Sequence, residues 1–325
     1  MTGTIDKDSY AFRRNVIPGL RKVDWSDATR QNEFVNSVVS ALNGVGENLD
    51  YDYVCAVSGS AFRTSFSVEG WNHGNYHVIN TPIILEHTFK MLGYEVSQHD
   101  CGDFETGSKL IMDSIDGGVP VITLDGVVQF ADACVISGYD DGGRVLLGWS
   151  PFMHVGDDHP EAPDETGYFR KTDGQCRRIL IIEGKCEKPD KQTVLTETLK
   201  LTSRLIREES LAPGQHNGLA AHRALADALL TRTWDDNYLV YMNVMCNYKE
   251  YLDRQYAVRF FCDHGRADLA GAYDEIAALC AKLGQIIPQD FSAGDMFSHK
   301  EKLRPYCDTL LQICDLEERV LTLLD

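Results

Sequence analysis

The sequence predicts an α+β protein built from two domains, because its two parts carry different residue patterns. Between residues 26 and 183, helical periodicity comes first and runs of β-branched and aromatic residues follow. That order is typical of helices packed on an antiparallel sheet, since parallel sheets alternate strand and helix. At 325 residues the chain is long enough for about two domains. We expect an α+β domain over 1–187 and an all-α helical domain over 188–325.

Three helices are expected early in the first domain. The segment NEFVNSVVSALNGVG, residues 32–46, repeats apolar side chains every three or four residues and closes on glycines, as amphipathic helices do. In TPIILEHTFKMLGY, residues 81–94, Thr81 suits the N-cap and Pro82 the first helical position. FETGSKLIMDSIDGG, residues 104–118, predicts the third helix, again ended by glycines.

Strand patterns replace helical ones from residue 119 onward. Four runs have strand length and composition: VPVITL (119–124), ACVISGY (133–139), RVLLGW (144–149) and RRILIIE (177–183). The DDGG sequence at 140–143 predicts a hairpin turn between the second and third runs. The segment 150–175 is too polar and too rich in proline and glycine for the core, so we expect it to leave the sheet.

The second domain is predicted to be helical throughout. A charged connector containing proline and glycine, residues 184–192, precedes it, and strand patterns disappear beyond that point. About five or six helices are expected, and their apolar stripes lie within 195–206, 218–230, 237–261, 271–284 and 303–325. The stretch 239–245 is so apolar that we expect it at the centre of a bundle.

Composition excludes several classes of function. The net charge of −18 repels phosphate backbones and anionic lipid, so neither nucleic acid nor membrane is an expected partner. No apolar run reaches the length of a signal peptide or a membrane span, which favours a cytoplasmic location. The ten cysteines include no CxxC pair and are expected to be reduced thiols.

The stretch YVCAVSGSAFR, residues 53–63, has the composition of a nucleophile helix. Ser58 could begin a helix there, and Gly59 would leave the approach to it open. A nucleophile at a helix start gains from unpaired backbone N–H groups, which stabilise an oxyanion, and from the positive end of the helix dipole. The alternative interpretation is an N-cap serine followed by small residues that allow close helix packing.

Three segments carry a resemblance to a known family. They are Ser58-Gly59-Ser60-Ala61, the run from Asp132 to Asp141 containing Ile-Ser-Gly-Tyr-Asp-Asp, and Trp149-Ser150-Pro151. Their order resembles that of papain-like enzymes, nearest to the bacteriocin-leader (double-glycine) peptidases and the N-terminal domain of the butirosin-biosynthesis acyltransferase. The resemblance covers residues 26 to 185 and implies helices packed on an antiparallel sheet.

The resemblance also implies that the catalytic triad has been replaced. The family's cysteine, histidine and aspartate positions hold Ser58, Asp132 and Ser150 here. An aspartate of ordinary pKa is a much weaker base than histidine, so hydrolysis is expected to be lost. The favoured function is therefore binding of a small molecule or peptide in the former cleft. The negative charge of Asp132 suits a cationic ligand there, and Gly59, Arg63 and Tyr139 are further candidate contacts.

Two other functions stay open. Cys55 could be a displaced nucleophile of an acyltransferase or amidase, with one of three histidines as its base: His73, His77 or His99. The apolar neighbours of Cys55 favour instead a buried small residue. A third possibility is an interaction protein that acts through its helical domain, including as a homodimer.

Two loops complete the candidate residues. The glycine- and asparagine-rich loop GWNHGNYHVIN is expected to contact the ligand through Trp71, His73, Tyr76 and His77. The segment 154–159 mixes histidines and aspartates in a way that gives only weak support for a metal. His216 and His222 lack the Glu-x-x-His partners of a di-iron bundle. We expect no metal and no cofactor.

Overall fold

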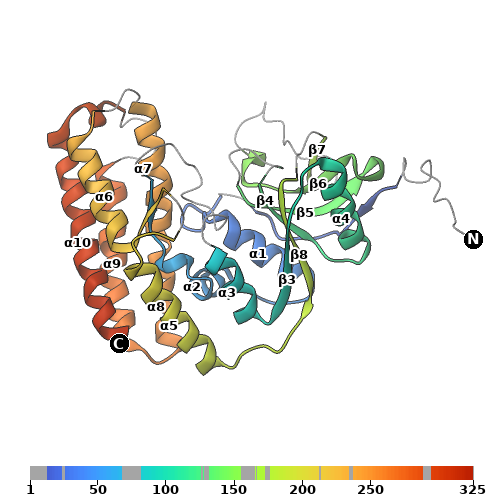
Figure 1. Ribbon diagram of the computed structural model, residues 1–325, viewed down its shortest axis with the longest axis horizontal. Coiled ribbons are helices and arrows are strands. Elements are labelled where there is room, and N and C mark those ends of the chain that lie inside the picture. Colours follow the sequence, from blue (N-terminus) through green and yellow to red (C-terminus); the bar gives the residue numbers. More distant parts are fainter. Residues whose placement is uncertain are drawn as a thin grey trace, which may run out of the picture. The chain divides into compact units, whose positions relative to one another are not determined.

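The computed structural model describes residues 13–23, 26–67, 82–125, 127, 132–154, 165, 167–172, 176–211, 214–233, 237–287 and 294–324 (Figure 1). Contacts within the chain divide it into two compact units. We call residues 1–51 and 93–187 the sheet unit, and residues 52–92 and 188–325 the helical unit. The expected division placed 52–92 in the first domain, whereas this segment packs with the C-terminal helices.

The described strands of the sheet unit form one antiparallel sheet. The order is β3 (Tyr94–Asp100), β8 (Arg178–Lys185), β4 (Val121–Asp125), β5 (Cys134–Asp140), β6 (Val145–Trp149) and β7 (Phe169–Lys171), and β1 (Asn15–Val16) pairs with β5. The predicted α+β class is confirmed. The central strands β4, β5 and β6 are almost wholly buried, as their apolar composition requires.

The β5–β6 hairpin forms at the predicted place. A single 3-10 turn over Asp141–Gly143 joins the two strands, and the Asp140 side chain accepts a hydrogen bond from the Asp141 N–H at 2.8 Å. Segment 150–175 departs from expectation in one respect. It contains β7, which pairs with β6 and buries Phe169 completely.

Two helices cover the sheet. α1 (Glu33–Gly44) begins at Asn32, whose side chain accepts a hydrogen bond from the Val35 N–H at 3.1 Å. α4 (Phe104–Asp116) begins at Asp103, which caps the Thr106 N–H at 2.7 Å. Both helices contact β4 and β5. Local capping chemistry therefore defines these helix starts, and an apolar stripe attaches each helix to the sheet.

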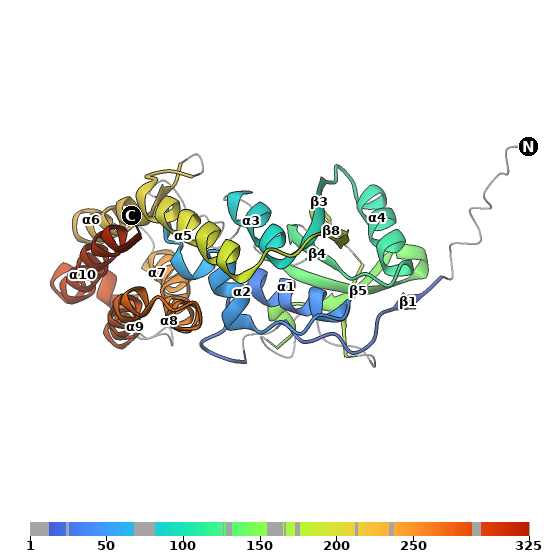
Figure 2. The same cartoon turned by 90° about the horizontal axis from the view of Figure 1, so that it is seen from below.

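The helical unit contains α2 (Tyr51–Val57), α3 (Pro82–Leu92), α5 (Lys191–Arg207), α6 (Gly218–Thr231), α7 (Asn237–Leu252), α8 (Arg254–Asp263), α9 (Ala267–Ile286) and α10 (Lys300–Leu324). Helices α6, α7, α9 and α10 run side by side, lengthwise in Figure 1 and end-on in Figure 2. The apolar stretch over 237–261 contains two helices, α7 and α8. None of the described helices is long and apolar enough to span a membrane.

The helical unit is not purely helical. β2 (Ser65–Phe66) pairs in antiparallel fashion with β9 (His216–Asn217). The prediction that strands end before residue 192 is therefore wrong at β9, which is too short to leave a pattern in the sequence. An aromatic cluster of Phe62, Phe261 and Tyr273 lies in the core, with ring centroids 5.3 to 5.6 Å apart.

Candidate functional site

Ser58 follows the end of α2 and does not open a helix. Its N–H donates to the Val54 carbonyl at 2.9 Å, and Gly59 then turns with a φ of 85°. The carbonyl end of a helix carries partial negative charge, which disfavours an oxyanion or a thiolate. The prediction of a nucleophile at a helix start is therefore wrong. Gly59 has a left-handed conformation, which ends α2 at a position where the sequence also suited the start of a helix.

The Ser58 hydroxyl is sealed inside the helical unit. Ser58 is fully buried, and its Oγ lies 3.0 Å from the Cys55 carbonyl oxygen and 2.9 Å from the Ser60 Oγ. The Ser60 N–H also donates to it, at 3.2 Å. A hydroxyl so engaged stabilises the turn between α2 and the following 3-10 helix over Ser60–Phe62.

Gly59 does not open an approach to Ser58. A β-carbon on Gly59 would lie 2.7 Å from one methyl group of Leu201 and 3.0 Å from one of Leu205, both on α5. The missing side chain therefore lets α5 pack directly on the turn. The expectation that Gly59 contacts a ligand is contradicted by this packing.

Cys55 has the environment of a structural cysteine. Its side chain is fully buried on α2. Burial first, and then the neighbouring Asp253 carboxylate, raise the pKa of the thiol well above its usual value. Because the thiolate is the nucleophile, this position disfavours attack by Cys55. Of its expected bases, His99 belongs to the sheet unit, and His73 and His77 lie outside the described residues.

The remaining triad positions belong to the sheet unit. Asp132 is 8% exposed, and Ser150 is fully buried after β6. Tyr139 on β5 is also buried, and its hydroxyl donates to the Asp116 carboxylate at 2.7 Å. Burial and that carboxylate raise the pKa of Tyr139 to about 12. Ser58, Gly59 and Arg63, in contrast, belong to the helical unit, so the sequence-predicted residues are divided between two separately packed bodies.

Arg63 is held in a buried polar cluster of the helical unit. Its guanidinium lies 3.5 Å from the Glu250 carboxylate and donates to the Ser65 hydroxyl at 3.3 Å. Glu250 also accepts a hydrogen bond from the Ser65 N–H at 3.1 Å. Burial raises the pKa of Glu250 to about 7, against the opposing effects of Arg63 and these hydrogen bonds. Arg63 thus anchors its own loop, which is a structural role and not the predicted ligand contact.

A second buried cluster centres on Arg254 and Glu317. The guanidinium donates to one Glu317 oxygen at 3.0 and 3.2 Å, and also to the Arg63 carbonyl and the Thr64 hydroxyl. The other Glu317 oxygen lies 2.9 Å from His222 Nε2. Burial favours the neutral carboxyl, but Arg254 and His222 outweigh it and hold the pKa of Glu317 at about 2. The hydrogen bonds of these groups go to one another and to the backbone, so the cluster stabilises the fold.

The described residues include no metal cluster. No group of three or more histidine, cysteine, aspartate or glutamate side chains within them is arranged to hold an ion. His222 uses both ring nitrogens, since Nδ1 lies 2.8 Å from the Tyr251 hydroxyl and Nε2 pairs with Glu317. Residues 155–159 of the mixed loop lie outside the described residues, as do Trp71, His73, Tyr76 and His77.

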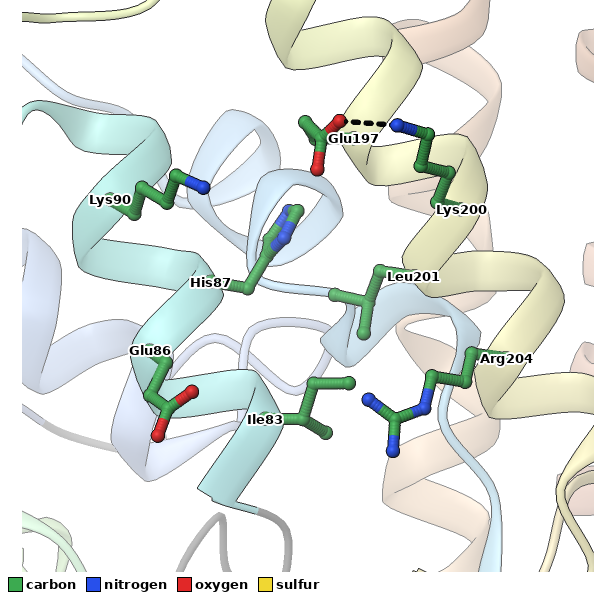
Figure 3. A pocket seen from close by; sticks show the side chains of 8 residues that line it. All are labelled: Ile83, Glu86, His87, Lys90, Glu197, Lys200, Leu201 and Arg204. Atoms are coloured by element: carbon green, nitrogen blue, oxygen red, sulfur yellow. Dashed lines mark hydrogen bonds and ion pairs between the residues drawn. The ribbon is translucent and has the colours of Figure 1, made fainter.

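An accessible pocket lies between α3 and α5 of the helical unit (Figure 3). Its volume is about 290 Å³. Matching faces of the two helices line it, each with residues at positions i, i+3, i+4 and i+7: Ile83, Glu86, His87 and Lys90 on α3, and Glu197, Lys200, Leu201 and Arg204 on α5. The pocket therefore combines apolar surface with five charged side chains and one imidazole.

His87 occupies the middle of the pocket and is neutral at pH 7. Figure 3 shows its ring pointing from α3 into the space between the helices. Burial lowers its pKa to about 4, assisted by Lys90 and opposed by Glu197 and by a hydrogen bond with the Val57 backbone. The Nε2 atom is buried and makes no hydrogen bond within the described structure. A neutral imidazole is also a good neighbour for the apolar Leu201 side chain.

Charges of both signs on the two helices face this pocket. Lys200 binds Glu197 at 2.7 Å, and Arg204 binds Glu208, so both recorded ion pairs stay within α5. Among the described residues no ion pair joins Lys90 or Glu86 on α3 to a residue of α5. The two helices thus present charges of both signs to a space wide enough to hold a ligand.

The sequence contained a signal for this pocket. Charged residues recur with helical spacing in both 83–90 and 197–204, among apolar residues. No ligand site was predicted at these positions, because the pairing of α3 with α5 joins segments more than 100 residues apart.

Comparison with known proteins gives no family assignment. No family model matches this chain, and no curated protein matches it either.

Proposed function

We propose that this protein binds a small zwitterionic molecule, such as an amino acid or a short peptide, without catalysing its conversion. The ligand lies in the pocket between α3 and α5. The observation that carries this proposal is that charges of both signs line the pocket, while among the described residues no ion pair joins α3 to α5 across it.

A zwitterion matches the charges that line the pocket better than an ion of one sign does. Its carboxylate can bind Lys90 or Arg204, and its ammonium group can bind Glu86 or Glu197. Because Glu86, Lys90 and Arg204 are exposed, each of these ion pairs is weak by itself, and the ligand depends on making both. The apolar body of the ligand then lies against Ile83 and Leu201.

The state of the expected nucleophiles supports binding without turnover. Ser58 and Cys55 are fully buried, and the Cys55 thiol has a raised pKa. Catalysis by either group requires exposure, a nearby base and a stabilised charge. The rival proposal, an acyltransferase or amidase acting through Cys55, is disfavoured because this thiol is fully buried and the neighbouring Asp253 carboxylate adds to the rise in its pKa.

The proposal extends to the evolutionary origin of the sheet unit. We infer a papain-like ancestor that lost its triad, on the basis of the Ile-Ser-Gly-Tyr-Asp-Asp sequence on the β5–β6 hairpin. A cytoplasmic location, with reduced cysteines and a metabolite as ligand, is the setting that this proposal implies.

Isothermal titration calorimetry of the full chain with the common amino acids and a set of dipeptides tests the function. We expect at least one zwitterion to bind, and its decarboxylated amine and its N-acetyl derivative each to bind about 10-fold or more weakly, because each lacks one charge. The double variant Lys90→Glu, Arg204→Glu should abolish binding of the free zwitterion.

Lys302→Glu supplies the matched control. It reverses a lysine on the exposed surface of α10, so binding should stay unchanged. The proposal is wrong if no zwitterion binds, or if the pocket variant binds as tightly as the parent. Release of a hydrolysis or acyl-transfer product that Cys55→Ser abolishes would instead establish the rival enzyme.

A further inference from the structure

Cys101 and Cys176 form a close pair of thiols in the sheet unit. Cys101 directly follows β3, Cys176 lies two residues before β8, and the two strands are neighbours in the sheet. The Cys101 N–H donates to the Arg177 carbonyl at 2.7 Å, which extends the β3–β8 pairing toward both cysteines. The backbone at this end of the sheet is therefore already held together.

Gly107 on α4 shows how near the two side chains are. A β-carbon on this glycine would lie 2.7 Å from the Cys176 β-carbon and 3.4 Å from the Cys101 β-carbon. The two cysteine β-carbons are consequently no farther apart than the sum of these distances. A disulfide requires about 3.5 to 4.5 Å between its β-carbons, so a modest adjustment is enough to form one.

We propose that Cys101 and Cys176 are a site of reversible oxidation and form a disulfide that ties the end of β3 to the start of β8. This inference is independent of the ligand pocket, which lies in the other unit. The pairing distinguishes these thiols from Cys55, which the described structure places beside a carboxylate, Asp253, and not beside a second thiol.

The surroundings indicate which oxidant acts. Burial, and then the nearby carboxylates of Asp100 and Asp103, raise the pKa of the Cys101 thiol. Both thiols are buried or nearly so, and a small neutral peroxide is therefore favoured over a bulky oxidant such as oxidised glutathione. Cys101 is 8% exposed and Cys176 is fully buried, which makes Cys101 the sulfur that meets the oxidant first.

The reaction balances with one hydrogen peroxide. The Cys101 thiol releases its proton, its sulfur attacks one peroxide oxygen and the O–O bond breaks. The hydroxide that leaves takes up the released proton, so a sulfenic acid and one water result. The raised pKa of this thiol makes the step slow. The Cys176 sulfur then attacks the Cys101 sulfur, the S–O bond breaks, and a second water leaves. Two thiols have lost two electrons and two protons, and the peroxide has been reduced to two waters.

Peptide mapping of the full-length protein tests the pair directly. After treatment with hydrogen peroxide and alkylation under non-reducing conditions, we expect a linked peptide containing Cys101 and Cys176, which dithiothreitol separates. The melting temperature should rise by about 2 to 8 °C on oxidation and return on reduction, because the cross-link restricts the unfolded chain.

Variants and an internal control complete the experiment. Cys101→Ser and Cys176→Ser should each remove the linked peptide and the shift in melting temperature, whereas Cys186→Ser, in the same unit, should keep both. The exposed Cys262 reports in every sample that the oxidant has acted. Recovery of Cys101 and Cys176 as free thiols while Cys262 is oxidised overturns the proposal, and so does a link that forms only in denaturant. The mapping of the parent protein decides this even if a variant fails to fold.

Discussion

Arg254 and Glu317 form a fully buried ion pair between α8 and α10, with nitrogen–oxygen distances of 3.0 and 3.2 Å. The same guanidinium donates to the backbone carbonyl of Arg63. One side chain therefore connects the loop after α2 to two helices near the end of the chain. This loop contains Ser58, one of the candidate catalytic residues, and Arg63, one of the predicted ligand contacts, and Arg254 holds it at Arg63 and Thr64.

Removing that carboxylate charge should destabilise the protein strongly. Glu317→Gln leaves the buried Arg254 without a counter-ion, and we expect a loss of roughly 3–5 kcal/mol in the free energy of unfolding. Urea denaturation followed by circular dichroism measures the loss. Glu318→Gln is the matched control, because Glu318 is exposed and should contribute within about 0.5 kcal/mol. Equal effects of the two variants would contradict the role assigned to the buried pair.

Gly59 should tolerate no side chain. Gly59→Ala requires an alanine at a φ of 85° and places its methyl group 2.7 Å from Leu201. Left-handed strain and overpacking together predict a loss of about 2–4 kcal/mol in the free energy of unfolding. Gly214 has a similar φ of 73°, with no atom within 4 Å of the added carbon.

Comparison of Gly59→Ala with Gly214→Ala therefore isolates the packing contribution. We expect only about 1 kcal/mol for Gly214→Ala, from backbone strain alone. Thermal denaturation of the two variants under the same conditions gives the difference. If Gly214→Ala is as damaging as Gly59→Ala, close packing of α5 on the turn is not what requires the glycine.

Cys55 should resist alkylation. Iodoacetamide at neutral pH should modify the exposed Cys262 quickly, while the buried Cys55, with its raised thiol pKa, reacts only as the protein unfolds. Mass spectrometry of timed samples follows each site. Cys262→Ser should remove the fast phase, and Cys55→Ser should leave it unchanged. Rapid, selective labelling of Cys55 would return the acyltransferase hypothesis to first place.

His87 should make stability depend on pH. Its pKa is about 4 in the folded protein and near the ordinary 6.5 in the unfolded chain. Between these values the unfolded chain binds more protons, so the free energy of unfolding rises with pH across this window and falls on acidification. Because His87 is partly exposed, we expect a contribution of about 1–3 kcal/mol.

His87→Gln should flatten this part of the pH profile. Urea denaturation of the parent and the variant at intervals from pH 4 to pH 7 measures it, and only the difference between the two curves is assigned to His87. His299→Gln, which changes an exposed histidine, should follow the parent curve. Parallel curves for the parent and His87→Gln would show that the imidazole carries no burial penalty.

Local signals in the sequence predicted much of the fold. The apolar residues of α1, the glycines after α1 and α4 and the DDGG turn act within a few residues, and the structure has these elements where the patterns placed them. β3 was missed, because its sequence YEVSQHD is mainly polar and only partly buried. It forms a strand because its backbone pairs with β8, and its composition does not indicate that pairing.

The functional interpretation depended on contacts that no local pattern contains. Ser58 and Gly59 suit both the start and the end of a helix. In the structure they follow the end of α2, and α5 packs against the turn there. The partners Arg254 and Glu317 are 63 residues apart in the sequence. The sequence by itself determined the α+β class, because periodicity and capping are local. Only the tertiary structure decided which polar residues are buried, because burial depends on which distant segments pack together.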